Sequence, residues 1–271
     1  MTGIDSLKQK AREVRWKVIL NSHHTQTPHL GSCLSCIDIL VALYWKVLKI
    51  DPKNPNDPNR DRFVLSKGLA APALFQVLGM KGFYPEKDLE KYGQDGSVFG
   101  EHPPTPSHLA GIEAATGSLG HGFPMAVGMA LSAKIKKQDY RTFAVLSDGE
   151  CNEGSTWEAA LFANAKALPR LTIVIDYNKW QATGRSDEVL QLKPLAEKWK
   201  AFGWKVKEVD GHDLEALVAA LEEGSRSETP TAIVAHTVKG KGVSFMEDDN
   251  NWHYRTPNAE ELAKSKIELG I

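Results

Sequence analysis

The sequence lacks the features that mark membrane, secreted and nucleic-acid-binding proteins. Its 271 residues contain no apolar run near the roughly 18 residues that a membrane span needs. The start, MTGIDSLKQKAREVRWKVIL, is charged at helical spacing and lacks the apolar core of a signal peptide. The formal net charge is only −1, so no overall field favours nucleic acid or an anionic membrane. We therefore expect a cytoplasmic protein that binds neither, and that holds any anionic ligand with local groups.

Cysteine is also scarce. The chain has three cysteines, Cys33, Cys36 and Cys151, and such an odd, sparse set favours reduced thiols in a cytoplasm. Cys33 and Cys36 form a C-x-x-C, but no second Cys/His pair lies at zinc-site spacing and no strand of a thioredoxin-like unit precedes them. We expect both to be buried helix residues without a redox or metal role.

What the sequence does contain is an alternation of apolar strands and helices. We expect strands at 141–147, 171–177, 204–210 and 231–237, and helices at 5–20, 34–48, 122–131, 155–168, 193–202 and 213–223. Continuous apolar strands that alternate with helices predict an α/β fold, a doubly wound parallel β-sheet flanked by helices. We expect one domain over residues 1–271, with a mostly irregular tail from about 243 that carries a short helix at 258–268.

Polar residues follow several of the predicted strands. Asp148, Asn178 and His236 come at strand ends, where ligands bind in parallel α/β sheets. Asp148 lies in SDGECNEG (147–154), where the turn and the start of the next helix expose backbone N–H groups that favour anions. The carboxylate of Asp148 and the amide of Asn178 give two hard oxygen ligands, and Mg²⁺ usually completes such a set with phosphate oxygens. The pattern therefore indicates a metal-bound diphosphate.

Six segments, taken in chain order, resemble one enzyme family. SDGECNEG followed by DYNKWQATG (176–184) is similar to the GDG…NK thiamine diphosphate motif of transketolases. PHLGSCLS (28–35) resembles the family's GHPGxxxS, SKGLAAP (66–72) its SKGHAAP, and TGSLGHG (116–122) its TGxLGQG. GEHP (100–103) matches its GHP with one insertion, and VKGKG (238–242) with WH (252–253) matches its VKGKG and WHG.

The resemblance implies a thiamine diphosphate site with Mg²⁺, for which Ca²⁺ or Mn²⁺ can substitute. The implied metal ligands are the side chains of Asp148 and Asn178 and the backbone carbonyl of Trp180. The implied cofactor-binding residues are Gly117, Ser118, Leu119, Asp148, Gly149, Glu150, Asn178, Lys239 and His253. The implied catalytic residues are His29, His102, His253 and Glu153, with Glu153 and Glu158 as an acidic pair at a dimer interface.

The sequence also departs from the family pattern. Leu69 stands where the family has a histidine, His121 replaces a glutamine, and Ala182 replaces a bulkier apolar residue. Ser147 replaces the first glycine of GDG, which is a mild change at the end of a strand. Because the loss of one polar contact to a charged group typically costs about 1.5–3 kcal/mol, the departures leave the cofactor prediction intact. They leave the identity of the sugar substrates open, and we expect His121 to compensate in part for Leu69.

The resemblance implies the N-terminal subunit of a split transketolase of the pentose phosphate pathway. Family members continue into a domain that binds the cofactor's pyrimidine, and no residues after 258 could form it, so we expect a partner subunit, with both chains in an α₂β₂ heterotetramer. Together they would move a two-carbon ketol unit from a ketose phosphate to an aldose phosphate. The alternatives are action on an unusual sugar, a 1-deoxy-xylulose-phosphate-synthase-like enzyme, a 2-oxo-acid dehydrogenase α-chain, or a non-catalytic cofactor-binding regulator.

Overall fold

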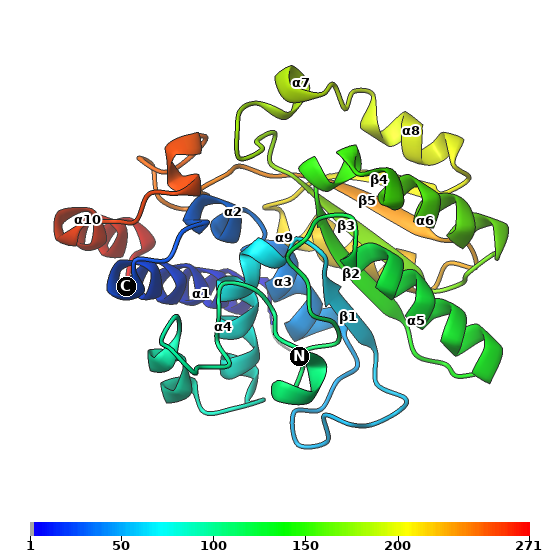
Figure 1. Ribbon diagram of the computed structural model, residues 1–271, viewed down its shortest axis with the longest axis horizontal. Helices are drawn as coiled ribbons and strands as arrows, with labels where there is room; N and C mark the ends of the chain where they lie inside the picture. The colour runs from blue at the N-terminus through cyan, green and yellow to red at the C-terminus, as the bar shows by residue number, and fades with distance from the viewer. Residues whose placement is uncertain (1–2) are drawn as a thin grey trace.

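A parallel sheet of five strands forms the centre of the computed structural model, which describes residues 3–271 (Figure 1). The strands are β1 (Arg62–Leu65), β2 (Thr142–Ser147), β3 (Leu171–Tyr177), β4 (Lys205–Asp210) and β5 (Thr231–His236). Their order is β1-β2-β3-β5-β4, and every neighbouring pair is parallel. The α/β prediction and its four strands are confirmed. The edge strand β1 was not predicted, because its four residues directly follow a charged, proline-rich loop.

Helices cover both faces of the sheet, because successive strand residues point to opposite sides. Phe143 and Val145 of β2 join the apolar cluster beneath one helical layer, whereas Ala144 and Leu146 join the cluster beneath the other. The first layer contains α1 (Ile4–Thr25), α2 (Leu30–Ser35), α3 (Ile37–Ala42), α4 (Ala71–Lys81) and α9 (Leu214–Ser225). The second contains α5 (Gly122–Lys136), α6 (Gly154–Ala165) and α8 (Leu195–Ala201).

The predicted helix at 34–48 begins earlier and is interrupted. The chain forms α2, breaks at Cys36, continues as α3 and ends in a π-helical turn at Leu43–Val47. Cys33 and Cys36 are free and fully buried, as expected, but only Cys33 lies within a helix, because Cys36 is at the break. Burial raises the pKa of both thiols. The helix α4 was not predicted, because residues 71–79 are all buried and leave no polar face to give the sequence a helical period.

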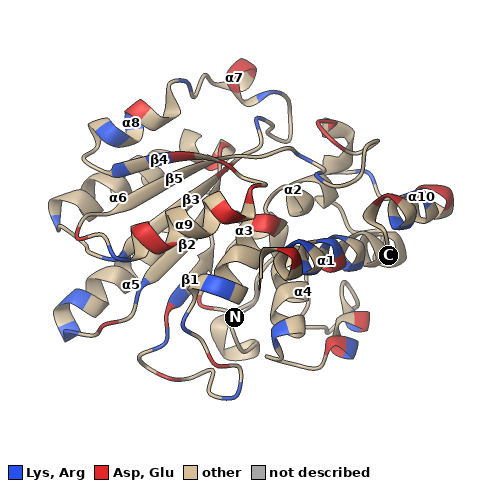
Figure 2. Ribbon diagram, turned by 180° about the vertical axis from the view of Figure 1, so that it is seen from behind, with Lys and Arg blue, Asp and Glu red and all other residues tan. Residues whose placement is uncertain are grey.

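The C-terminal segment after β5 is irregular up to α10 (Ala259–Leu269), apart from a 3₁₀ turn at Asn250–His253. Asn258 and Glu261 form a capping box that starts α10, and this helix packs against α1 (Figure 1). A short helix, α7 (Ser186–Val189), follows the loop after β3. Among residues 3–271, no helix combines the length and the apolarity needed to cross a membrane. Figure 2 shows Lys and Arg interspersed with Asp and Glu along the outer helices.

Candidate cofactor site

The oxygen ligands predicted for a metal lie at the carboxyl ends of β2 and β3. Asp148 directly follows β2 and Asn178 directly follows β3, and both are buried. One carboxylate oxygen of Asp148 accepts the Gly149 amide at 2.9 Å. The other accepts the Lys179 amide at 2.9 Å and the Ser186 hydroxyl at 2.7 Å. Four neutral groups therefore hold the two side chains at one edge of the sheet, since Asn178 is itself fixed by the Trp180 amide at 3.0 Å.

The electrostatics of this edge fit a divalent cation. Burial raises the pKa of Asp148 to about 6, although hydrogen bonds from Ser186 and Gly149 oppose the change. A buried carboxylate bonded only to neutral donors would gain from a nearby cation. The described residues contain no group of three or more His, Cys, Asp or Glu side chains that could hold a metal ion. A cation here would therefore need further oxygens, such as a backbone carbonyl and phosphate groups.

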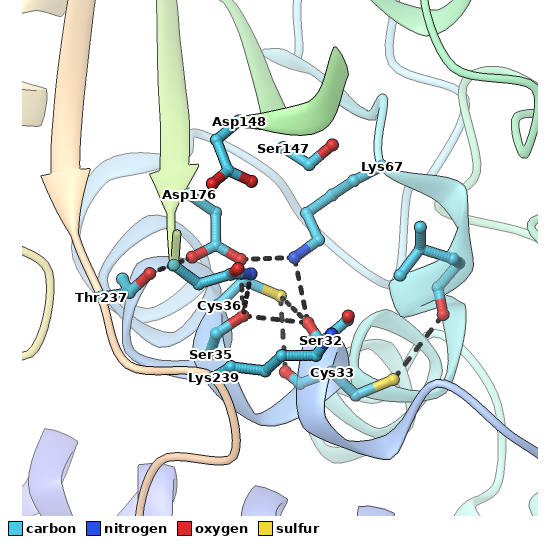
Figure 3. Close-up of polar contacts among 12 residues, drawn as sticks. Ser32, Cys33, Ser35, Cys36, Lys67, Ser147, Asp148, Asp176, Thr237 and Lys239 are labelled. Atoms are coloured by element: carbon cyan, nitrogen blue, oxygen red, sulfur yellow. Dashed lines mark hydrogen bonds and ion pairs between the residues drawn. The ribbon is translucent and has the colours of Figure 1, made fainter. Parts of the chain in front are cut away.

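A buried ionic network lies beneath these ligands (Figure 3). The Lys67 ammonium pairs with Asp176, the last but one residue of β3. Asp176 also accepts hydrogen bonds from the hydroxyls of Ser35, at 2.6 Å, and Thr237. Burial lowers the pKa of Lys67, but the Asp176 carboxylate outweighs burial and the pKa is raised overall. The network ties α2, the end of β3 and the end of β5 together two residues before Asn178.

Sequence reasoning missed this network. Lys67 lies within the segment SKGLAAP (66–72), and Asp176 directly precedes Tyr177 and Asn178, but the sequence patterns assigned a role to neither. The signal that could have found them was a charge of each sign in segments otherwise apolar enough to be buried, since buried charges are almost always paired.

A pocket of about 250 Å³ opens between the strand ends and the loop after β3. It is lined by Ser32, Lys67, Leu69, Leu119, Ser147, Gly149, Asn178, Trp180, Gln181, Ala182, Thr183 and His253. Five of the predicted site residues line this pocket: Leu119, Gly149, Asn178, Trp180 and His253. They come from chain segments that are far apart in sequence. Two departures from the family pattern, Leu69 and Ala182, also line the pocket.

Lys239 lies beside the pocket, in the loop after β5. Its side chain is fully buried, and its ammonium donates to the Asn250 side chain at 2.6 Å and lies 3.2 Å from Nδ1 of His253. Burial, and then the charge of Lys67, lower the pKa of Lys239 to about 8. An ammonium held in this way would be stabilised by an anionic ligand, since burial and the charge of Lys67 both disfavour its charged form.

The three predicted histidines come together beside the pocket, which His253 lines. The ring centroids of His29 and His253 are 5.0 Å apart, and those of His29 and His102 are 6.1 Å apart. The His29 amide donates to the carbonyl of His253 at 2.6 Å. Burial, followed by the charge of Lys239, lowers the pKa of His253 to about 3, and burial also lowers the pKa of His29. Neutral imidazoles at this position can both donate and accept hydrogen bonds.

The turn at 117–120 packs against this cluster. Gly117 has φ +154°, and a Cβ atom there would come within 2.6 Å of the His102 ring. Ser118 is exposed beside it, whereas Leu119 lines the pocket. Glu150 is buried below the turn, where it accepts hydrogen bonds from the Ser66 hydroxyl and, at 3.2 Å, the Gly120 amide. Its carboxylate therefore supports the turn rather than lining the pocket.

The remaining predicted residues lie outside the pocket. Glu153 and Glu158 are exposed near the start of α6. His121 is exposed, with its Nδ1 atom 3.1 Å from the Leu119 carbonyl, so it does not stand in for the histidine that Leu69 replaces. His236 ends β5, and its ring pairs with Glu208 on β4 at 2.9 Å, away from the metal ligands.

Comparisons with known proteins agree with this geometry. The family model "Transketolase, thiamine diphosphate binding domain" matches residues 7–271. The chain is 36% identical over 267 residues to one of the named subunits of the apulose-4-phosphate transketolase of Phocaeicola vulgatus, covering 98% of this chain and 94% of that protein. It is 43% identical over 220 residues to the 6-deoxy-6-sulfo-D-fructose transketolase subunit SqwG of a Clostridium species, covering 81% of this chain and 80% of that protein.

Single-chain transketolases are longer. The solved transketolase of Campylobacter jejuni superposes with a TM-score of 0.91 at 30% identity, covering 99% of this chain but only 43% of that one. The chain thus spans less than half the length of that enzyme. These matches confirm the resemblance predicted from the motifs and the predicted enzyme class, a transferase of the transketolase type. The chain belongs to the transketolase family, and it carries the thiamine diphosphate binding domain of that family.

Proposed function

We propose that this chain is the cofactor-diphosphate subunit of a split transketolase. With a pyrimidine-binding partner subunit, thiamine diphosphate and Mg²⁺, it transfers a two-carbon ketol unit from a ketose phosphate to an aldose phosphate. The observation that carries the proposal is a pocket lined by Gly149, Asn178 and His253. Asp148 directly precedes Gly149, and the Lys239 ammonium lies 3.2 Å from Nδ1 of His253, whose ring also contacts the ring of His29. Relatives of similar length are named as transketolase subunits, which supports the split arrangement.

The residues at the pocket have separate roles in this proposal. Asp148 and Asn178 bind the metal through oxygen, with the carbonyl of Trp180, and Ca²⁺ or Mn²⁺ could replace Mg²⁺. Gly149 lines the pocket without a side chain, so the backbone there can lie close to the diphosphate, and the Lys239 ammonium supplies a charged donor to its oxygens. When bound, thiamine diphosphate supplies the nucleophilic carbon for the sugar carbonyl.

The histidines act on the substrate rather than on the metal. His29, His102 and His253 donate hydrogen bonds to sugar hydroxyls and to the oxygen that gains negative charge, and they carry protons to and from it. A low pKa for His253 supports this role, because an uncharged imidazole keeps one donor and one acceptor at neutral pH.

The outer face of α6 supports a contact between subunits. Leu161 and Phe162 of α6 are 56% and 42% exposed, and Met125 of α5 is 43% exposed, which is unusual for large apolar side chains on neighbouring helices. Glu153 and Glu158 lie at the start of the same helix and would link two active sites across that contact. We propose an α₂β₂ particle, since closed two-fold assemblies are the commonest.

The substrate is proposed as a class only. The named relatives act on apulose-4-phosphate and 6-deoxy-6-sulfo-D-fructose, so unusual sugars fit the proposal as well as pentose phosphates do. Leu69 in the pocket lining supports a changed preference, because it removes a polar group from the site. Three free, buried thiols are compatible with the cytoplasmic location that we propose.

Calorimetric titration with thiamine diphosphate, with and without Mg²⁺, tests the cofactor part of the proposal. We expect metal-dependent binding by the chain with its partner subunit, and weak binding by the chain alone. Binding that is strong without any divalent metal, or that survives Asp148→Ala unchanged, would refute the assignment of the metal ligands. Replacement of exposed Asp139 by alanine is the matched control and should change nothing.

A further inference from the structure

A further histidine, His212, makes a contact that the proposed mechanism does not use. It lies in the turn between β4 and α9, and its ring bridges the buried Asp38 and the half-buried Val238. The Nδ1 atom lies 2.7 Å from a carboxylate oxygen of Asp38 on α3. The Nε2 atom accepts the backbone amide of Val238 at 2.9 Å. Val238 directly precedes Lys239 in the chain.

The partners of the ring fix its protonation. Burial raises the pKa of Asp38, but Arg15 and His212 outweigh it and hold that pKa below its usual value. Arg15 donates to both carboxylate oxygens, at 3.2 and 2.5 Å. An ionised Asp38 can only accept, so Nδ1 of His212 carries the proton. The Val238 amide can only donate, so Nε2 must be unprotonated, and the contact therefore requires a neutral ring.

Arg15 holds the other side of the same loop. Its Nε atom donates to the carbonyl of Lys241 at 2.9 Å. A Cβ atom on Gly242 would lie 2.7 Å from the Arg15 side chain, so the loop and the guanidinium are in close contact. His212 and Arg15 thus fix the backbone on both sides of Lys239.

We propose that His212 is a positioning residue for Lys239. Oriented by Asp38, the neutral ring fixes the Val238 amide and so directs the Lys239 ammonium toward the pocket. The inference rests on the proposed function, because it takes Lys239 as the contact to the cofactor's diphosphate. Loss of the Nε2 acceptor leaves the Val238 amide without this hydrogen bond, which releases the loop and weakens cofactor binding.

Charged groups of both signs surround the ring. Besides Asp38 on α3 and Arg15 on α1, the Asp210 carboxylate at the end of β4 accepts the His212 amide at 2.9 Å. In the segment after β5, Glu247 pairs with Lys241 at 3.1 Å. The contribution of the ring is therefore measured as a difference between variants that keep these charges unchanged.

Two substitutions separate the hydrogen bond from the bulk of the ring. His212→Gln can place its amide oxygen near the position of Nε2, where it accepts the Val238 amide at any pH. His212→Leu fills the space but accepts nothing. The matched control is His236→Leu, because His236 also pairs with a carboxylate near this loop but leaves the Val238 amide untouched.

The first measurement is amide exchange at Val238 in the cofactor-free chain, followed by NMR. We expect about tenfold faster exchange in His212→Leu, and near wild-type exchange in His212→Gln and in the control. The second measurement is the dissociation constant of thiamine diphosphate with Mg²⁺ and the partner subunit. We expect His212→Leu to weaken binding about tenfold, and to add no further loss once Lys239→Met is present.

A further variant keeps the inference testable if His212→Leu fails to fold. His212→Asn keeps a polar side chain but is too short to accept the Val238 amide, so it should bind the cofactor about tenfold more weakly than His212→Gln. Equal affinities for these two variants, unchanged Val238 exchange in His212→Leu, or additive losses with Lys239→Met would each overturn the inference and leave the proposed function standing. A wild-type complex that binds no cofactor would instead refute the proposed function and the role of Lys239. This holds even if the exchange data establish the hydrogen bond between His212 and the Val238 amide.

Discussion

Replacing Asp148 with asparagine should stabilise the cofactor-free chain while it removes cofactor binding. Without a metal, the buried carboxylate is held by neutral donors alone, and its pKa is raised to about 6 from an ordinary value of 3.8. That difference corresponds to about 3 kcal/mol of destabilisation by the ionised group at neutral pH. An asparagine carries no charge, but its NH₂ group cannot accept one of the backbone amides, which costs about 1 kcal/mol. The net expected gain is about 2 kcal/mol, or a rise in Tm of roughly 4 °C.

The effect has a defined dependence on pH. A carboxyl group whose pKa is higher in the folded chain than in the unfolded chain destabilises the fold only where it is ionised. Below about pH 4 both states are protonated and the destabilisation is absent; it grows as the pH rises and is complete above about pH 6. The advantage of Asp148→Asn should therefore appear between these values and remain constant toward pH 8.

Thermal melts of metal-free protein across this pH range measure the gain. Addition of thiamine diphosphate and Mg²⁺ with the partner subunit should raise the Tm of the wild type but not of Asp148→Asn, because only a state that binds ligand is stabilised by it. Asp139→Asn is the control, since that side chain is 93% exposed in a surface ion pair and should give no gain. A metal-free variant no more stable than the wild type at pH 7, or one that still responds to the cofactor, would show that Asp148 is not a strained metal ligand.

Three further predictions concern the same site. Asn178→Ala should abolish cofactor binding, and calorimetry of the double variant with Asp148→Asn should reveal no added loss, because both act on one metal. His102→Ala should lower kcat/KM for the ketose donor with little change in cofactor affinity, and steady-state kinetics that showed the reverse would move His102 to the diphosphate site. Lys67→Met should destabilise the chain by about 3–5 kcal/mol in urea unfolding, because it leaves Asp176 charged and unpaired in the core. An unfolding midpoint close to that of the wild type would contradict the buried ion pair.

The parts of the fold that follow from periodicity could be predicted from the sequence. The strands β2, β3 and β5 are continuous apolar runs, and parallel strands bring their carboxyl ends to one edge. The rule that ligands bind at this edge was enough to predict that Asp148 and Asn178 belong to one site. His236 also ends a strand at this edge, but its side chain turns toward Glu208 on the neighbouring strand.

Contacts between polar residues far apart in the chain could not be predicted in this way. Asp176 and Lys67 are separated by 109 residues, and His212 and Asp38 by 174. Neither pair produces a periodic pattern in the sequence, because each contact depends on how α2, α3 and the loops pack over the sheet. The hydrogen bond from the Ser66 hydroxyl to the Glu150 carboxylate, which joins residues 84 positions apart, is a further contact of this kind.

Ketol transfer by this chain, purified to homogeneity and assayed with thiamine diphosphate and Mg²⁺, is the most direct test of the split-enzyme proposal. We expect no turnover by the chain alone, because the pocket offers groups for the metal, the diphosphate and the sugar but none identified for the pyrimidine. Addition of the partner subunit should restore transfer from a ketose phosphate to an aldose, together with a rise in mass to that of an α₂β₂ particle. Sustained turnover by the chain without any partner would show that a complete active site lies within these 271 residues, and the proposal would be wrong.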